Sequence, residues 1–330
     1  MTSGKLPPRI AVTGGAGYLG TTLVNALLAE TSVEAVVAID LAPQRSESGR
    51  VVSVKGDVRQ SLAGLLAEHD VQAIVHLAYP MRHQRSYDDI KPYAEDATNY
   101  LLNAASFLGI GRVVLCSSTT VYGATPGVEQ VATETTPRCP NANYLYAIGK
   151  DIMEHTAERH PRFGSGVVVV RPCTVVGPSA DSYLFRRFFG TEVVVRDTDP
   201  AIQLLHERDF AHAILAVLRS DVTGPLNIAP KDWVRRAELF RLFQVRPAEV
   251  TREELSRRMA TRWRDAREDI QSVQPEMIDL LNYSWLADPT RLNDLVGFTP
   301  AHSSLDSLLE LFRGFRRRWK QQGPVPGAAG

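Results

Sequence analysis

Residues 9–20 read Arg9-Ile10-Ala11-Val12-Thr13-Gly14-Gly15-Ala16-Gly17-Tyr18-Leu19-Gly20, and this stretch decides the fold of the chain. An apolar run of strand length leads into a glycine-rich turn, and residues 19–30 have the length and spacing of a helix. Such a turn lets the backbone approach a pyrophosphate, whose charge meets the N–H groups at the helix N-terminus. We therefore expect a dinucleotide-binding turn whose cofactor contacts come from Gly14, Gly17, Tyr18 and Leu19.

A carboxylate closes the next apolar run. Asp40 follows Ala35-Val36-Val37-Ala38-Ile39, at the place where a second parallel strand should end. There a carboxylate accepts hydrogen bonds from a ribose 2′-hydroxyl and repels a 2′-phosphate, which favours NAD over NADP as the cofactor. Arg45 and Arg50 lie in the loop just beyond and keep NADP open as an alternative.

A tyrosine and a lysine four residues apart indicate the chemistry. Tyr146 and Lys150 share one helix face, so the ammonium can favour the phenolate. The tyrosine would then exchange a proton with a substrate hydroxyl or carbonyl while a nicotinamide exchanges hydride. Taken alone, the spacing also fits an exposed surface pair. Tyr144, six residues before the lysine, lies well around the helix from it and is expected to pack or to line the pocket.

The composition excludes several classes of protein. Lys plus Arg equals Asp plus Glu at 37 each, so no overall field attracts nucleic acid or an anionic membrane. The longest strongly apolar stretch, near residues 166–170, is too short for a membrane span. The three cysteines, Cys116, Cys139 and Cys173, show no paired metal spacing, and no signal peptide precedes the first strand. We expect a reduced, cytoplasmic protein that acts on a small molecule and has no metal site.

The first half alternates apolar runs with amphipathic stretches, the pattern of a parallel sheet covered by helices on both faces. The expected strands lie near residues 9–13, 34–40, 51–55, 72–76, 112–117 and 166–171. The expected helices span 19–30, 61–68, 87–108 and 144–160. This predicts an α/β protein with a doubly wound parallel (Rossmann) sheet and a smaller, discontinuous C-terminal substrate domain.

The domain division follows from where the regular alternation breaks after Arg171-Pro172. We expect residues 1–172 to bind NAD, with 201–230 returning to the same domain as a strand at 203–205, a helix at 209–219 and a strand at 225–229. Residues 173–200 and 231–321 should form the substrate-binding domain, and 322–330 a disordered tail. The segment 233–299 reads as helical and rich in arginine, with a solvated face or a substrate phosphate as the alternatives for its charges. Residues 305–319 read as a closing amphipathic helix.

Several further motifs occur in a fixed order along the chain. They are Gly56-Asp57-Val58, His76-Leu77-Ala78, Ser117-Ser118-Thr119-Thr120-Val121-Tyr122-Gly123, Arg171-Pro172 with Val176-Gly177-Pro178, and His206-Glu207-Arg208-Asp209. With the glycine turn and the tyrosine–lysine pair, they resemble the extended short-chain dehydrogenase/reductase family, in particular its NAD-dependent epimerase/dehydratase branch. The resemblance covers nearly the whole chain.

The resemblance implies roles for individual residues. Tyr146 would be the general acid/base, Lys150 would lower its pKa and bind the nicotinamide ribose, and Ser118 would hydrogen-bond the reacting oxygen. Alone, Ser118 also fits a cap on a strand-end turn. The remaining cofactor contacts would come from Asp57 and Val58 at the adenine and from Leu77, Ala78, Tyr79 and Pro172 in the cleft. Val58, Leu77 and His76 also fit plain core positions.

The resemblance also narrows the reaction. Dehydratases of the family carry an Asp-Glu pair after the catalytic hydroxyl residue and decarboxylases a glutamate, whereas this chain has Thr119-Thr120. Two positions that often hold the substrate diphosphate are Thr174 and Ile202 here, which weakens a nucleotide-sugar assignment. Arg82, His83 and Arg85 offer compensating cations beside the cleft. The candidate substrate residues are therefore Arg82, Thr119 and Thr174.

Three functions are consistent with these residues. The first is an NAD-dependent sugar epimerase, with a nucleotide sugar as substrate, that oxidises a hydroxyl transiently. The second is an NAD(P)-dependent alcohol dehydrogenase or ketoreductase on a non-nucleotide substrate, which an aromatic segment at 183–189 favours. The third is a non-catalytic dinucleotide sensor, which has no need of a proton relay. The resemblance also implies a homodimer formed through the helices at 87–108 and 144–160.

Overall fold

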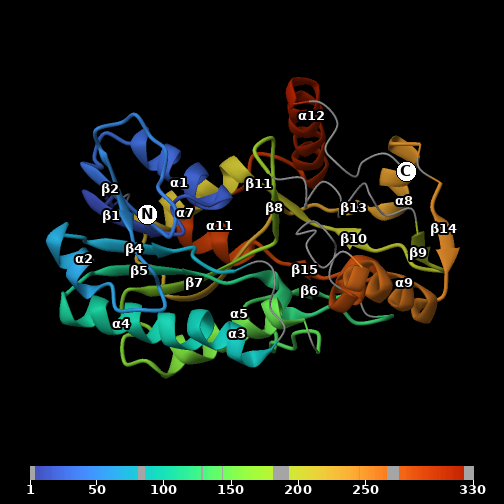
Figure 1. The fold of residues 1–330 in the computed structure, drawn as a ribbon, viewed down its shortest axis with the longest axis horizontal. Helices are drawn as coiled ribbons and strands as arrows, with labels where there is room; N and C mark the ends of the chain where they lie inside the picture. The colour runs from blue at the N-terminus through green and yellow to red at the C-terminus, as the bar shows by residue number, and fades with distance from the viewer. Residues whose placement is uncertain are drawn as a thin grey trace.

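The computed structural model describes residues 4–80, 86–127, 129–142, 144–180, 193–244, 246–265 and 275–322. Figure 1 shows a large sheet with helices on both faces in one half of the molecule, and short strands with further helices in the other half. The predicted cations of the loop at 82–85 and the aromatic segment at 183–189 lie outside the described residues.

The main sheet has seven strands, all parallel, in the order β12-β7-β5-β4-β1-β2-β3. They are β1 (Arg9–Thr13), β2 (Ala35–Asp40), β3 (Val51–Lys55), β4 (Ala73–His76), β5 (Arg112–Cys116), β7 (Val167–Pro172) and β12 (Gly224–Ile228). The winding direction reverses between β1 and β4, and a crevice opens at such a reversal, outside the carboxyl ends of the strands. The predicted doubly wound sheet is confirmed.

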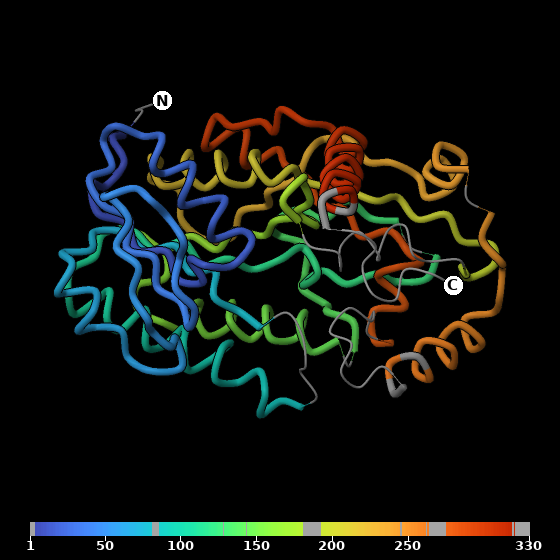
Figure 2. The backbone as a smooth tube through the Cα atoms, turned by 45° about the horizontal axis from the view of Figure 1, so that its top comes forward, coloured from blue at the N-terminus to red at the C-terminus, as the bar shows by residue number. Residues whose placement is uncertain are grey.

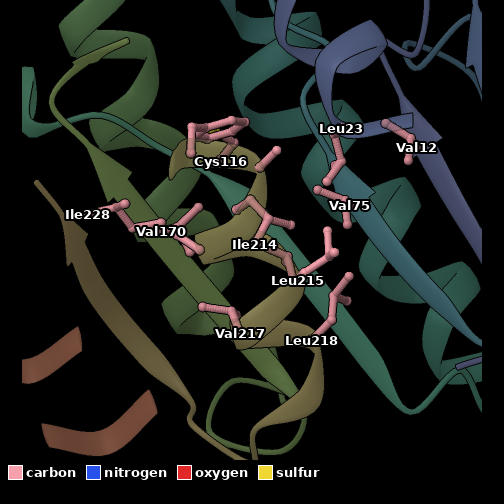
Figure 3. Close-up of a cluster of buried hydrophobic side chains, with 14 of the residues drawn as sticks. Val12, Leu23, Val75, Cys116, Val170, Ile214, Leu215, Val217, Leu218 and Ile228 are labelled. Atoms are coloured by element: carbon pink, nitrogen blue, oxygen red, sulfur yellow. The ribbon is translucent and has the colours of Figure 1, made fainter. Parts of the chain in front are cut away.

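Strand residues alternate between two cores. On β4, Val75 packs into the cluster on one face and Ile74 into the cluster on the other, which is why the strands are apolar almost throughout. Figure 3 shows the first cluster, where Ile214 and Leu218 lie against strand residues such as Val170. Both faces of the sheet are therefore fully covered.

The helices divide between these faces. The first face is covered by α1 (Tyr18–Leu28), α7 (Glu207–Arg219) and α11 (Thr290–Val296). The second is covered by α2 (Ala63–Glu68), α4 (Ala97–Phe107) and α5 (Leu145–Arg159). The sequence predicted α1, α2, α5 and α7 to within two residues at each end.

The single helix predicted at 87–108 is wrong in one detail. The segment consists of α3 (Tyr87–Lys91), a π-helical turn η1 (Pro92–Asp96) and then α4. Pro92 has no N–H and cannot complete the α-helical ladder, and a wider turn at this point removes the conflict.

Figure 2 shows the orange chain around residues 236–265 at the end of the molecule opposite the blue N-terminal segment. Outside the main sheet, the described residues form four two-stranded sheets. They pair β10 (Ala201–Ile202) with β13 (Val234–Arg235), β11 (Leu204–His206) with β8 (Thr174–Val176), β14 (Ala248–Val250) with β9 (Val193–Val195), and β15 (Leu286–Ala287) with β6 (Val131–Ala132). The prediction that 233–299 is helical throughout is therefore wrong, because β13, β14 and β15 interrupt it. The helices there are α8 (Arg236–Leu242), α9 (Arg252–Asp265), η3 (Pro275–Met277) and α10 (Ile278–Asn282).

The closing helix α12 (Ser304–Gln322) stands out from the body of the molecule (Figure 1). Leu308 and Leu311 bury its apolar face in a cluster with Val176 and Leu204. The helix includes residue 322, so the tail predicted from that residue starts one residue too early, and 323–330 lie outside the described part of the chain. Within the described part, no helix has both the length and the apolar character to cross a bilayer.

Candidate active site

The glycine turn is fixed by close approaches that a side chain would prevent. The Gly14 amide donates to the Ile39 carbonyl at 2.8 Å, and Gly14 has φ +70°, in the left-handed region. A Cβ there would lie 2.8 Å from the Ala78 nitrogen, and a Cβ on Gly20 would lie 2.0 Å from the Gly14 carbonyl oxygen. The turn is therefore pressed between β2 and the loop after β4.

Helix α1 begins at Tyr18, directly after this turn. Gly17 is its N-cap residue and, within the described chain, no side chain caps the first turn. A helix N-terminus preceded by glycines is a binding site for a phosphate group. A Cβ on Gly17 would have only the Gly14 carbonyl oxygen within 4 Å, so the turn is open to a ligand at Gly17, and these residues fit a dinucleotide.

Asp40 lies at the carboxyl end of β2, beside the turn. Its Oδ2 accepts a hydrogen bond from the Ala16 amide at 3.0 Å, and its Oδ1 accepts one from the Leu41 amide at 2.7 Å. Arg50, which kept NADP open, donates to the carbonyls of Leu28, Glu30 and Val33. The Arg50 guanidinium therefore binds carbonyl groups at and just after the end of α1. A ribose 2′-hydroxyl suits the Asp40 carboxylate better than a 2′-phosphate does.

Hydrogen bonds connect the carboxyl ends of β1 and β4 next to the glycine turn. The Thr13 hydroxyl contacts His76 Nδ1 at 2.7 Å, and the Leu77 amide donates to the Thr13 carbonyl at 3.1 Å. Burial, with a smaller contribution from Lys150, lowers the pKa of His76 to about 3, so this imidazole is neutral. His76 is buried in the sheet, and Leu77, Ala78 and Tyr79 follow it at the crevice.

Lys150 reaches the same edge of the sheet from α5. Its Nζ is buried, donates to the Cys116 carbonyl at 2.7 Å and lies 5.7 Å from the centre of the Tyr146 ring. Burial lowers the pKa of Lys150 to about 8. Tyr144 is buried among apolar residues, whereas Tyr146 is half-buried. The lysine thus stands between the end of β5 and the tyrosine.

Ser118 follows β5 and is the N-cap of the short helix η2 (Thr119–Tyr122). Its Oγ accepts a hydrogen bond from the Thr120 amide at 3.2 Å, which is the capping role, and the O–H remains a donor. The strand whose last carbonyl binds Lys150 therefore also presents Ser118 at the crevice.

The other predicted residues lie at the ends of neighbouring strands. Asp57 binds Arg59, with Oδ2 2.6 Å from Nη2, and this pair holds the pKa of Asp57 below its usual range. Val58 is buried in a core cluster. The Thr119 hydroxyl donates to the carbonyl of Pro172 at 3.4 Å, and Thr174 begins β8 just beyond.

A buried ion pair that the sequence did not predict lies one helical turn from Lys150. Glu154, one helical turn further along α5, binds Arg171 through three contacts, the shortest being 2.6 Å between Oε2 and Nη2. The Ser117 hydroxyl donates to Glu154 Oε1 at 2.5 Å, and Arg171 also donates to the Tyr122 hydroxyl at 2.7 Å. The spacing of Glu154 from Lys150, four residues, is the signal that could have revealed it.

A second missed contact joins the glycine turn to the other half of the molecule. The Tyr18 hydroxyl donates to Glu207 Oε2 at 2.6 Å, and the same carboxylate accepts a hydrogen bond from the Ser179 amide. The side chain of Tyr18 therefore holds a buried carboxylate of α7, while its backbone begins α1.

Known proteins resemble this chain along almost all of its length. It is 26% identical to a UDP-glucose 4-epimerase of Azospirillum brasilense, over 98% of this chain and 96% of the relative. It is 28% identical to a dTDP-glucose 4,6-dehydratase of Streptomyces niveus, over 97% of each. The crystal structure of a dTDP-glucose 4,6-dehydratase from Bacillus anthracis in complex with NAD has the same fold, with a TM-score of 0.72 and 18% identity over 95% of this chain and 98% of that one.

A family model supplies the assignment. The model described as the NAD dependent epimerase/dehydratase family matches residues 10–229, which include the glycine turn, Asp40, Ser118, Tyr146 and Lys150. NAD is therefore the cofactor of this enzyme, in agreement with the carboxylate at the end of β2. The chain belongs to the NAD-dependent epimerase/dehydratase family of extended short-chain dehydrogenases/reductases.

Proposed function

We propose that this enzyme is a nucleotide-sugar epimerase that oxidises a substrate hydroxyl transiently and reduces the resulting ketone from the other side. The observation that carries the proposal is the pair Thr119-Thr120, both buried, after Ser118. Elimination of water needs an acid/base besides the tyrosine. In the described part of the site, the buried carboxylate of Glu154 is already bound by Arg171 and Ser117.

The proposed mechanism assigns one task to each side chain. Tyr146 as phenolate removes the proton of the reacting hydroxyl and later returns it, Lys150 stabilises that phenolate, and Ser118 donates a hydrogen bond to the reacting oxygen. NAD, held at the glycine turn and Asp40, supplies reversible hydride transfer when bound. The Tyr18, Leu19, Asp57, Val58, Leu77, Ala78 and Pro172 contacts with this cofactor are part of the proposal.

The substrate class rests on the relatives. The two named relatives act on UDP-glucose and dTDP-glucose, and we propose a nucleotide sugar for this enzyme too. Arg82, outside the described residues, and Thr119 and Thr174 are the proposed substrate contacts. A dehydrogenase or ketoreductase acting on a non-nucleotide alcohol is the second candidate, because Ile202 packs against an apolar cluster where a diphosphate-binding arginine would otherwise be expected.

The test begins with mass spectrometry of the small molecules that acid releases from the purified protein. Near-stoichiometric NAD, with a nucleotide sugar beside it, supports the epimerase. The released sugar is then incubated with fresh enzyme. A product of unchanged mass indicates epimerisation, loss of one water indicates dehydration, and stoichiometric NADH indicates a dehydrogenase. Either of the last two results contradicts the proposal.

Tyr146→Phe provides the matched variant. It removes one hydroxyl and leaves the glycine turn and Asp40 intact, so NAD should remain bound while turnover falls by roughly 10²–10⁴-fold. Released NAD and initial rates are measured on the same preparation. Activity close to that of the unchanged enzyme would exclude the tyrosine as the acid/base.

We also propose that residues 1–172 and 201–230 form the NAD domain and 173–200 and 231–321 the substrate domain. The pairing of β12 with β7 supports the return of the chain to the first domain. A cytoplasmic homodimer is the proposed assembly. Tyr87, Tyr100 and Phe107 are exposed on α3 and α4, Phe107 by 85%, as expected of a face that a second copy covers. A mass near 36.4 kDa in light scattering would contradict the dimer.

A further inference from the structure

Tyr79 places an aromatic ring directly against Lys150. It belongs to the loop after β4, and its ring centre lies 4.1 Å from Lys150 Nζ. The same ring meets the Tyr146 ring edge-on, with centres 5.6 Å apart and planes at 84°. Tyr79 therefore contacts both members of the tyrosine–lysine pair from the loop after β4.

Gly149 provides the space for this ring. A Cβ built on Gly149 would lie 1.7 Å from the Tyr79 hydroxyl oxygen, so the phenol rests on the bare backbone of α5. Within the described chain, this buried hydroxyl has no hydrogen-bond partner. Burial raises the pKa of the Tyr79 phenol, which stays protonated near neutral pH. Packing of the ring, and not hydrogen bonding of its hydroxyl, therefore fixes its position.

The other groups around Lys150 compensate its charge only in part. His76 on β4 is neutral, and the thiol of Cys116 on β5 stays protonated because burial raises its pKa. Glu154 on α5 is shared with Arg171. The Cys116 carbonyl accepts one hydrogen bond from Nζ. The face of an aromatic ring carries negative potential and attracts a cation at such a distance.

We propose that Tyr79 is a positioning residue, whose ring face keeps the Lys150 ammonium charged and directed at Tyr146, and that Gly149 is the space the ring requires. The inference rests on the proposed function, because it concerns the charge that favours the Tyr146 phenolate. It is tested on the substrate-free protein, so its failure is distinct from failure of the epimerase assay.

The experiment is a pH titration of Lys150 by NMR in protein labelled with ¹³C at lysine Cε. The sequence has six lysines, and Lys150→Gln identifies the resonance. Tyr79→Leu keeps an apolar cover but removes the ring, and we expect it to lower the pKa of Lys150 by about one unit. Tyr79→Phe keeps the ring and removes only the hydroxyl, so the pKa of Lys150 should not change.

Two further measurements make the test decisive. Gly149→Ala should displace the ring and lower the pKa of Lys150 as Tyr79→Leu does, with circular dichroism confirming that each variant is folded. The pH profile of turnover should lose its alkaline part in Tyr79→Leu, since the ammonium deprotonates earlier. An unchanged or raised pKa of Lys150 in folded Tyr79→Leu, or an equal shift in Tyr79→Phe, would overturn the proposal.

Discussion

Replacing Glu154 with leucine should destabilise the protein strongly, although Glu154 lies outside the proposed chemistry. Glu154 and Arg171 are each 1% exposed, and the carboxylate accepts three hydrogen bonds from the Arg171 guanidinium, one from Ser117 and a longer one, at 3.3 Å, from Arg138. Leucine fills most of the volume but leaves a buried guanidinium without its counter-charge. Removal of one partner of a buried ion pair costs about 3–5 kcal/mol.

The assay is urea unfolding near neutral pH, followed by tryptophan fluorescence. With an unchanged denaturant slope, the shift in midpoint reports the loss of unfolding free energy. Glu254→Gln is the control, because Glu254 pairs at the surface with Arg257 and Arg258, whose side chains are 77% and 45% exposed. An exposed pair contributes at most about 1 kcal/mol.

A double variant separates the lost charge partner from lost packing. In Glu154→Leu with Arg171→Met, neither charge of the buried pair remains, and Arg138 keeps Asp151 and Glu158 as partners, so most of the stability should return. The Tyr122 hydroxyl loses a donor in this variant, although it still donates to Asn227. A single-variant loss of no more than about 1 kcal/mol, or a double variant no more stable than the single one, would refute the reasoning.

Two further predictions concern the cofactor turn and pH. Gly20→Ala should abolish stable NAD binding, because its Cβ would lie 2.0 Å from a carbonyl oxygen of the turn. Gly64→Ala is the control and should bind NAD normally, because nothing lies within 4 Å of its Cβ. Calorimetric titration with NAD measures both affinities, and equal affinities would contradict the close-approach argument. The pKa of His76 is lowered to about 3, so the unfolded chain binds a proton that the folded chain excludes. Stability is therefore complete above about pH 6.5 and falls by about 2 kcal/mol on reaching pH 5. Urea midpoints at several pH values measure this loss of stability. The loss should be smaller in His76→Gln, and an equal loss in that variant would contradict the assignment to His76.

The sequence predicts the main sheet well because its signals are local. Most strands are apolar runs that are buried on both faces, although the edge strand β3 is partly exposed, and the glycine turn marks the end of β1. The short strands escape prediction because two or three residues carry no periodicity of their own. β9 and β14 form only through each other, and the residues that pair, such as Val193 with Ala248, lie far apart along the chain. The π-helical turn at Pro92 has a local cause, but a proline inside a helical pattern also fits a simple kink or break.

In the candidate site, too, the sequence reveals local features and not long-range contacts. The sequence locates Ser118, Tyr146 and Lys150 through fixed spacings along one element or after one strand. It cannot locate contacts between distant segments, such as Tyr18 with Glu207 or Tyr79 with Lys150, because each joins residues from different loops and helices. These pairings depend on the relative placement of whole elements. They also decide whether the predicted groups carry the charge that the chemistry requires.

The charge of Lys150 links the stability of this fold to its proposed chemistry. Burial lowers the pKa of Lys150, while the carboxylate of Glu154 acts in the opposite direction. Glu154 is held in place by Arg171, at the end of β7, so the ion pair that supports the fold also supports the ammonium. Loss of the pair should therefore lower the pKa of Lys150 even in molecules that remain folded. Glu154 acts through its charge from one turn along α5, and the Tyr79 ring acts through its face at 4.1 Å from Nζ, so two separate interactions offset the costly burial of the ammonium.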